Sequence, residues 1–395
     1  MKKLTSKHKV LSLLILLLSI QFAANSKNNQ SSTFVDQLMF NIPDSITHSE
    51  EKIAEFINFV FSSEAEKSRA VFYWIANNIS YDATNIFAFS IIRDVNEEPA
   101  GILETRKGVC HDYVLLYKKL ADKVGLKTAV VTGYTKKRGR VSGNPHAWIA
   151  IQINSEWYLT DPTWGAGYLQ DGEFIKKFNP TYFNVDPELF AKSHIPFDPI
   201  WQLSNFPITK QEFHSKKKRK QKNLAFFNFK DSIQKYETQP RIERLESMRN
   251  RIMANGISNY LDHDHLVHLQ SKIVHHYRKL NETNYYAALN KYNKGIAVFN
   301  EFIGYKNLYF QPFKGDQAIK QMLKQTKEIL EKSQSYLKQV GDLPSMAQLK
   351  NQLYQSIGKA LLDLDKAKSN LHADLELARN YRTRLTQNLN TQKDK

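Results

Sequence analysis

This chain of 395 residues contains one cysteine, and the residues around that cysteine are typical of a nucleophile. Cys110 comes shortly after Gly108, and apolar residues at helical spacing follow it: Val114, Tyr117, Leu120, Ala121 and Val124. We therefore expect Cys110 at the start of a helix of about four turns that Gly125 closes. The free amide groups of a helix start favour the thiolate, which is the reactive form. The alternative is an inert, buried cysteine.

A histidine and an aspartate follow in chain order, and both flank a predicted β-hairpin: His146 comes before its first strand and Asp161 after its second. Residues 148–153 and 156–160 have the composition of strands, and Asn154 with Ser155 fits a two-residue turn. If Ile153 pairs with Glu156, then His146 and Asp161 come to one face of the ribbon. Asp161 can then bind one ring nitrogen of His146 and leave the other for Cys110, which is the set a thiol enzyme needs. Taken singly, each could be an ordinary hairpin-end residue.

The group that stabilises an oxyanion is less well marked. Backbone N–H groups at the start of the Cys110 helix are the simplest candidates. Trp74 and Tyr81 lie in the helical segment 66–82 and carry side-chain donors, but aromatic residues on an amphipathic helix more often belong to a core. We therefore assign neither of them to the site.

The segments 108–113, 144–148 and 159–165 together resemble the transglutaminase-like superfamily, whose core is a cysteine at a helix start, a histidine strand and an aspartate strand. The helical segment 66–82 and the later segments 182–188 and 194–202 extend this likeness over residues 35–210. They are similar to a bacterial, exported branch near the kyphoscoliosis-type peptidases. The resemblance implies that Cys110 is the nucleophile, His146 the general base and acid, and Asp161 the group that orients His146.

The resemblance also implies a fold and an activity. The expected fold is α+β, with a papain-like core in which the cysteine helix packs on an antiparallel sheet. The expected activity is that of an exported thiol enzyme, first of all a cysteine peptidase, which acts on amide bonds of peptides or proteins through an acyl-thioester on Cys110. A protein-glutamine transamidase would use the same triad, and a non-catalytic envelope adaptor is the alternative from another class. No cofactor or metal is expected, because the His- and Asp-rich segment 262–276 reads better as a helix cap and a solvated face.

The first residues have the features of a secretory signal peptide. Residues 1–9 include four lysines, residues 10–24 are nearly all apolar, and residues 24–26 offer a small-residue cleavage site. The apolar stretch is short for a membrane span, although an uncleaved anchor is the alternative. We expect a signal peptide over residues 1–26 and a periplasmic or extracellular protein, free or attached to a membrane surface. A single cysteine in an oxidising compartment forms no internal disulfide, which agrees with a reactive role.

The second half of the chain differs in charge and pattern. From Asn205 to the end there are 34 Lys and Arg against 18 Asp and Glu, a net charge of +16. Apolar residues recur at helical spacing in 318–340 and 345–388, and Gly341 to Pro344 break the pattern. We therefore expect a catalytic domain over 35–210, a basic linker over 211–223 and an all-α accessory domain over 224–395. An anionic membrane surface or envelope polymer is a more plausible partner for the basic helices than nucleic acid, and the alternative is a face that only keeps the protein in solution. A fragment ending near Lys210 is expected to fold.

Overall fold

The computed structural model of this protein describes residues 33–84, 101–215 and 225–393. The expected signal peptide and most of the expected basic linker lie outside these residues. The chain forms two compact units, Met1–Gln270 and Ser271–Lys395. The division falls inside the long helix α11 (Tyr260–Asn307) and not at the basic segment. Whether residues 35–210 fold as a domain on their own stays a prediction. The first compact unit, however, continues to Gln270.

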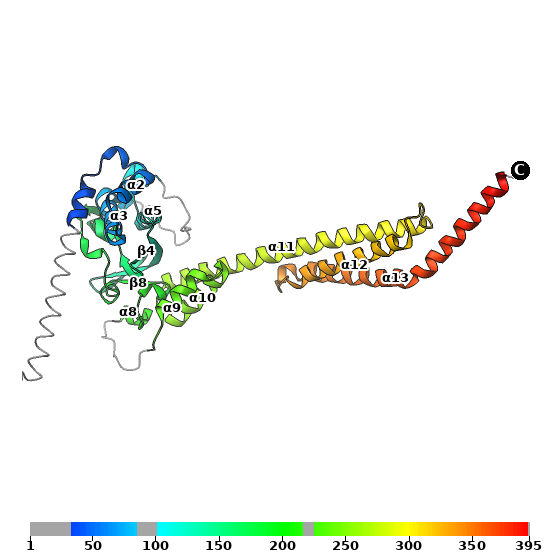
Figure 1. The fold of residues 1–395 in the computed structure, drawn as a ribbon. Coiled ribbons are helices and arrows are strands. Elements are labelled where there is room, and N and C mark those ends of the chain that lie inside the picture. The colour runs from blue at the N-terminus through cyan, green and yellow to red at the C-terminus, as the bar shows by residue number, and fades with distance from the viewer. Residues whose placement is uncertain (1–32, 85–100, 216–224, 394–395) are drawn as a thin grey trace, which may run out of the picture. The chain divides into compact units, whose positions relative to one another are not determined.

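The first unit combines short strands with helices on both sides (Figure 1). Its strands are β1 (Ser80–Tyr81), β2 (Lys107–Gly108), β3 (Lys127–Lys137), β4 (Arg140–Ile153), β5 (Glu156–Thr160), β6 (Gly167–Gln170), β7 (Glu173–Lys176) and β8 (His194–Pro196). Its helices before the basic segment are η1 (Asp44–Ile46), α2 (Glu50–Val60), α3 (Glu64–Asn78), α4 (Ile102–Thr105), α5 (Cys110–Lys123), α6 (Pro162–Ala166), η3 (Pro180–Tyr182), α7 (Pro187–Phe190), η4 (Pro199–Gln202) and α8 (Lys210–His214). After it come α9 (Phe229–Thr238), α10 (Arg241–Asn255) and the start of α11.

The central sheet has four antiparallel strands in the order β5-β4-β3-β8. Ile153 pairs with Glu156, as the sequence predicted for the β4–β5 hairpin. The two turn residues, Asn154 and Ser155, both have positive φ angles, of 50° and 68°. A turn of this kind matches the twist of the strands it joins and so fixes their register. The α+β fold with a cysteine helix on an antiparallel sheet is therefore confirmed.

The two faces of the sheet pack against different sets of helices. On one face, Ala147, Ile149 and Ile151 of β4 belong to a core that includes residues of α2, α3 and α5. On the other face, Trp148 and Ala150 pack in a second core with side chains of α7, η4 and α9. Because both faces of this part of β4 are covered, residues 147–151 form an unbroken apolar run and not an alternation. The strand that carries His146 is thus held from both sides.

Helices after the basic segment complete the first unit. Ile233 of α9 is buried in the second core, together with Trp201 of η4. Arg251 of α10 makes a two-pronged ion pair with Asp198, with N···O distances of 2.8 and 2.6 Å. These contacts explain why the compact unit extends to Gln270 although the sequence placed residues from 224 onward in the accessory domain.

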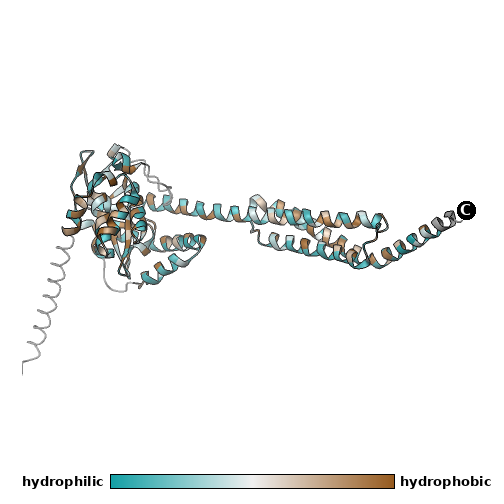
Figure 2. Cartoon of the chain, turned by 45° about the horizontal axis from the view of Figure 1, so that its top comes forward, coloured by the Kyte–Doolittle hydropathy of each residue, from teal (hydrophilic) through white to brown (hydrophobic). Residues whose placement is uncertain are grey.

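The second unit consists of the rest of α11 and of α12 (Asp316–Lys338) and α13 (Pro344–Lys393). Apolar and polar residues are interspersed along these helices (Figure 2). The predicted helices and the break at Gly341 to Pro344 are confirmed. Aromatic side chains of α11 pack on them: Tyr285 is buried with Leu337 and Ile357, and Phe302 with Leu323. Across the described ranges, no helix combines the length and the apolar character that crossing a membrane requires.

Candidate active site

Cys110 is the first residue of α5, where the chain changes from strand β2 to helix. Its side chain is buried, with 2% of the residue exposed. The turn before it is tight: a Cβ on Gly108 would lie 2.8 Å from Cβ of Asp112, so a side chain does not fit there. Asp112 accepts a hydrogen bond of 2.9 Å from the amide of Val109 and so ties the turn to the helix. The helix start that the sequence predicted for Cys110 is confirmed.

His146 and Asp161 are in direct contact. Nε2 of His146 lies 2.8 Å from Oδ2 of Asp161, and both residues are buried. The route to this contact differs from the expected one. The β4–β5 ladder stops at the pair Ile149 and Thr160, and Asp161 leaves the strand to cap helix α6. Pro162 explains the change, because it has no N–H for the ladder and fits the first position of a helix.

Both carboxylate oxygens of Asp161 are fixed by hydrogen-bond donors. Oδ1 accepts from the backbone amides of Thr163 and Trp164, at 2.9 and 3.0 Å. Oδ2 lies 2.8 Å from Nε2 of His146 and 3.1 Å from Nε2 of His194. A buried carboxylate with four donors is fully satisfied, so its orientation toward His146 is set by the fold.

His194 is a member of the site that the sequence reasoning did not assign. It begins β8, which pairs antiparallel with β3, and its ring is 1% exposed. The ring stacks on Phe190, with centroids 4.0 Å apart, and packs against Trp164 at 4.6 Å. The segment 194–202 contributed to the family resemblance, but no local pattern links a histidine 33 residues downstream to Asp161.

The charges of the cluster are divided between its members. Burial alone would lower the pKa of His146, but the charge and hydrogen bond of Asp161, together with Cys110, outweigh it and raise this pKa to about 10. Burial opposes ionisation of Asp161, yet both histidines more than offset this, and the pKa of the carboxyl is lowered. Burial lowers the pKa of His194, which its bond to Asp161 offsets only in part. At neutral pH, His146 is therefore charged, His194 neutral and Asp161 ionised.

The same cluster is the one place in the described residues where His, Cys, Asp and Glu side chains converge like the ligands of a metal. His146, Asp161 and His194 each offer one ligand atom, and these atoms lie within 4.8 Å of one another. Each imidazole, however, directs an Nε2–H at the same carboxylate oxygen at hydrogen-bond distance. Hydrogen bonds from the two imidazoles to Asp161 account for these short distances. The three side chains therefore form a hydrogen-bonded carboxylate and not a set of metal ligands.

The two aromatic residues considered at the sequence level lie in different surroundings. Tyr81 of β1 pairs with Gly108, two residues before Cys110. Burial, followed by the charges of Cys110 and Asp161, raises the pKa of Tyr81 well above its usual range. Trp74 is fully buried, and its Nε1–H has no hydrogen-bond partner in the part of the chain that the structure describes. Tyr81 thus stands close to the thiol, whereas Trp74 belongs to the core of α3.

Comparison with known proteins agrees with this geometry. Residues 55–162 match the family model described as the transglutaminase-like superfamily, and they include Cys110, His146 and Asp161. The chain is 31% identical over 161 residues to the kyphoscoliosis peptidase of Mus musculus, and 31% identical over 162 residues to that of Homo sapiens. Each alignment covers 39% of this chain and 24% of the relative, so the matched part spans about a quarter of these relatives' length.

A solved structure, a crystal structure of a TGase, shares 23% sequence identity with this chain, with a TM-score of 0.24, over 35% of this chain and 36% of the other. The boundaries of the family-model match enclose the cysteine, the histidine and the aspartate that the first unit brings together. This chain carries a domain of the transglutaminase-like superfamily.

Proposed function

We propose that this protein is a thiol enzyme that acts on amide bonds of peptides or proteins, and that it is a cysteine peptidase. Cys110 is the nucleophile, His146 exchanges protons with the reacting groups, and Asp161 holds His146 in place. One observation carries the proposal. The imidazole of His146 lies 2.8 Å from Asp161, and a hydrogen bond with Cys110 and the charge of its sulfur help to raise the pKa of the same imidazole. Residues 55–162, which match the model of the transglutaminase-like superfamily, include the same three residues, and two relatives of this chain are named as peptidases.

The chemistry follows from the charge distribution. With its pKa raised to about 10, His146 holds its proton at neutral pH and pairs with the Cys110 thiolate. The sulfur attacks the carbonyl carbon of the substrate, and His146 gives its Nδ1 proton to the leaving amine as the C–N bond breaks. Water then attacks the acyl-thioester while His146 takes a proton from it. The C–S bond breaks, and the acid product leaves with the thiolate restored.

Transfer to an amine instead of water would make the enzyme a transamidase with the same residues in the same roles. The partition depends on which nucleophile reaches the acyl-thioester. We propose hydrolysis as the main outcome because the matched relatives are named as peptidases. An added fluorescent primary amine tests this choice: its incorporation into protein glutamines, in place of cleavage, would assign the transamidase activity.

Cleavage of a denatured protein mixture tests the proposal directly. New peptide N-termini, identified by mass spectrometry, are expected with the parent protein and absent with Cys110→Ala. Acid quenching should leave an acyl group on Cys110 in the parent. The Cys110→Ala protein should retain its melting temperature within a few degrees, because a change from sulfur to hydrogen at a helix start removes little packing. Equal cleavage by both proteins would contradict the assignment of the nucleophile.

A second measurement separates an enzyme from an adaptor without any substrate. The thiolate–imidazolium pair should react with iodoacetamide at pH 6, and the reaction should slow at least about tenfold in His146→Ala because the partner that stabilises the thiolate is gone. A thiol that reacts slowly and identically in both proteins would favour the adaptor, in which the fold acts as a scaffold only.

We further propose that the protein is exported and that its basic helices bind anionic surfaces. Residues 1–26, which have the features of a signal peptide, support export. The second unit supports surface binding, because residues 271–395 contain 21 Lys and Arg but only 11 Asp and Glu. N-terminal sequencing of the protein from cell fractions tests export. Co-sedimentation with vesicles of anionic and of neutral lipid, at low and high salt, tests the surface. Salt-independent or equal binding to both vesicles would contradict it.

A further inference from the structure

The feature that the proposed mechanism does not use is the second imidazole on Asp161. His194 and His146 approach the same oxygen, Oδ2, from two different strands, and their ring centroids are 5.7 Å apart. Both are buried, and Oδ1 of the carboxylate is already occupied by two backbone amides. The charge of Oδ2 is thus shared between two N–H donors, of which only one belongs to the proposed triad.

The hydrogen bonds around His194 determine its tautomer. Asp161 accepts only, so Nε2 of His194 carries the proton of the 3.1 Å bond. Nδ1 lies 2.8 Å from Oγ of Ser193, and a neutral ring takes the hydroxyl proton there. Each ring nitrogen then has one side-chain partner, and the backbone of Phe190 also interacts with the ring. His194 is a neutral donor toward the carboxylate, whereas His146 is the charged one.

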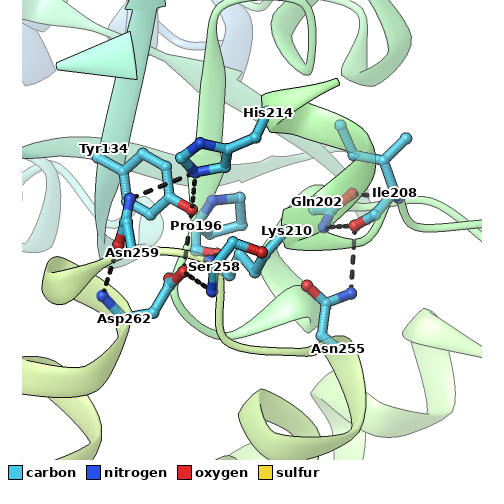
Figure 3. A network of polar contacts seen from close by, with 10 residues as sticks. All are labelled: Tyr134, Pro196, Gln202, Ile208, Lys210, His214, Asn255, Ser258, Asn259 and Asp262. Carbon is cyan, nitrogen blue, oxygen red and sulfur yellow. Dashed lines mark hydrogen bonds and ion pairs between the residues drawn. The ribbon is translucent and has the colours of Figure 1, made fainter. Parts of the chain in front are cut away.

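The ring is held on all sides, so this bond is rigid. Phe190 stacks on it, and Trp148 meets it edge-on with centroids 5.3 Å apart. The strand β8 is itself fixed at its other end, where the carbonyl of Pro196 accepts a hydrogen bond from the buried ammonium of Lys210 (Figure 3). Lys210 in turn lies 3.4 Å from Asp262 of α11, which also accepts from the hydroxyl of Tyr134 at 3.2 Å.

We propose that His194 is a positioning residue of the active site: its neutral Nε2–H takes part of the charge of Asp161 Oδ2 and thereby limits how firmly His146 holds its proton. This inference rests on the proposed function, because it assigns His194 a part in the proton transfers of His146. A carboxylate without this donor would concentrate its charge on the remaining partner. His146 would then release its proton to the leaving amine less readily.

The titratable groups around the two rings come from several elements. Cys110 of α5 and Asp161 at the start of α6 act on His146, and His194 faces it from β8. Tyr81 of β1 and Tyr182 of η3 lie near the carboxylate, and the charge of Asp161 adds to burial in raising the pKa of each hydroxyl. Both hydroxyls have a pKa above the ordinary tyrosine value of about 10, and the titration of His146 reaches the same alkaline range, so the tyrosine absorbance is followed in parallel in the parent and in the variant.

The experiment is a titration of the full-length protein labelled with ¹⁵N-histidine, together with kinetics on a cleaved peptide. In the parent protein at neutral pH, His146 should show both ring nitrogens protonated and His194 only Nε2. In His194→Phe, His146 should hold its proton to a higher pH, and the alkaline limb of kcat/KM should move with it. We expect kcat to fall roughly tenfold, equivalent to about 1.4 kcal/mol, with KM unchanged.

Two further variants separate positioning from packing. His194→Gln keeps an N–H donor for Asp161 and an acceptor for Ser193, and it should restore the titration of His146 and most of kcat. Phe190→Leu removes the stacked ring but no hydrogen bond, and it should lower the melting temperature while leaving the titration of His146 in place. An unchanged titration in His194→Phe, with activity lost only in proportion to folded protein, would show that His194 is merely structural.

The two readouts also distinguish this inference from the proposed function. If the parent protein cleaves no amide but the titration of His146 moves in His194→Phe, then the positioning role stands and the proposed activity fails. If the parent is active and the titration does not move, then the activity stands and the role of His194 is overturned.

Discussion

Arg251 and Asp198 form a two-pronged ion pair that joins helix α10 to the loop directly after strand β8. Asp198 is 4% exposed, so water does not reach its carboxylate and the guanidinium of Arg251 compensates the negative charge. The pair ties a helix that follows the basic segment to the strand that carries His194. The compact unit that holds the candidate site is therefore larger than the family match, which ends at residue 162.

The first prediction concerns this pair. Arg251→Ala leaves a buried carboxylate without its partner and should lower the free energy of unfolding by about 3 kcal/mol or more. Lys230→Ala is the matched control, because Lys230 pairs with Glu156 at the surface, where both side chains are more than half exposed. That change should cost less than about 1 kcal/mol. Urea unfolding followed by tryptophan fluorescence measures both, and equal losses would contradict the structural role of Arg251.

The second prediction concerns where the chain can be cut. A fragment ending near Lys210 was expected to fold, but it would lose the buried side chains of Phe213, Ile233 and Ile252 and the partner of Asp198. We now expect that fragment to be insoluble or to lack a reactive thiol. A fragment ending at Gln270 should keep both the fold and the thiol, since the compact unit ends there. Iodoacetamide labelling of the two soluble fractions decides between these outcomes, and a folded, reactive short fragment would overturn this expectation.

The third prediction is that Asp161→Asn preserves the fold and abolishes most of the turnover. An asparagine oxygen can still accept from the amides of Thr163 and Trp164 and cap α6. The uncharged amide cannot stabilise the imidazolium of His146, and kcat should fall about 100-fold or more. Circular dichroism and steady-state kinetics test the two halves separately. Parent-like turnover would mean that Asp161 serves only as a helix cap.

The fourth prediction concerns pH. The pKa of His146 is raised to about 10 from its usual value near 6.5, so its proton is bound more tightly in the folded protein. The stabilisation from this group is full below about pH 6.5 and is lost as the pH rises through about 10. Activity should decline over the same alkaline limb, because the imidazolium is the proton donor to the leaving amine.

The control for this prediction is the difference between two proteins. Burial lowers the pKa of Lys210 to about 8, so this lysine also titrates in the alkaline range. It does so equally in the parent and in His146→Gln, and its effect cancels in their difference. The gap in melting temperature between the two should be widest near pH 6, should narrow between about pH 6.5 and pH 10, and should be smallest above pH 10. A gap that stays constant across this range would show that the proton on His146 contributes nothing to stability.

The sequence determined the features that depend on neighbouring residues. Helical spacing after Cys110 placed it at a helix start, and the two turn residues fixed the register between Ile153 and Glu156. Such features follow from backbone hydrogen bonds and side-chain periodicity over a few residues, so they can be read from a single chain. Helices α12 and α13 of the second unit were predicted for the same reason. The contact between His146 and Asp161 was anticipated, although through a longer ladder than the one that forms.

Only the tertiary structure decided the long-range partners. His194 reaches Asp161 across 33 residues of chain, and Arg251 reaches Asp198 across 53. No local sequence pattern predicts such pairs. They form because packing on both faces of the sheet determines where β8 and α10 lie. The extent of the first unit could not be predicted for the same reason: composition changes at the basic segment, but burial of apolar and charged side chains continues past it. Composition is a property of a segment, whereas burial is set by what the rest of the chain puts against it.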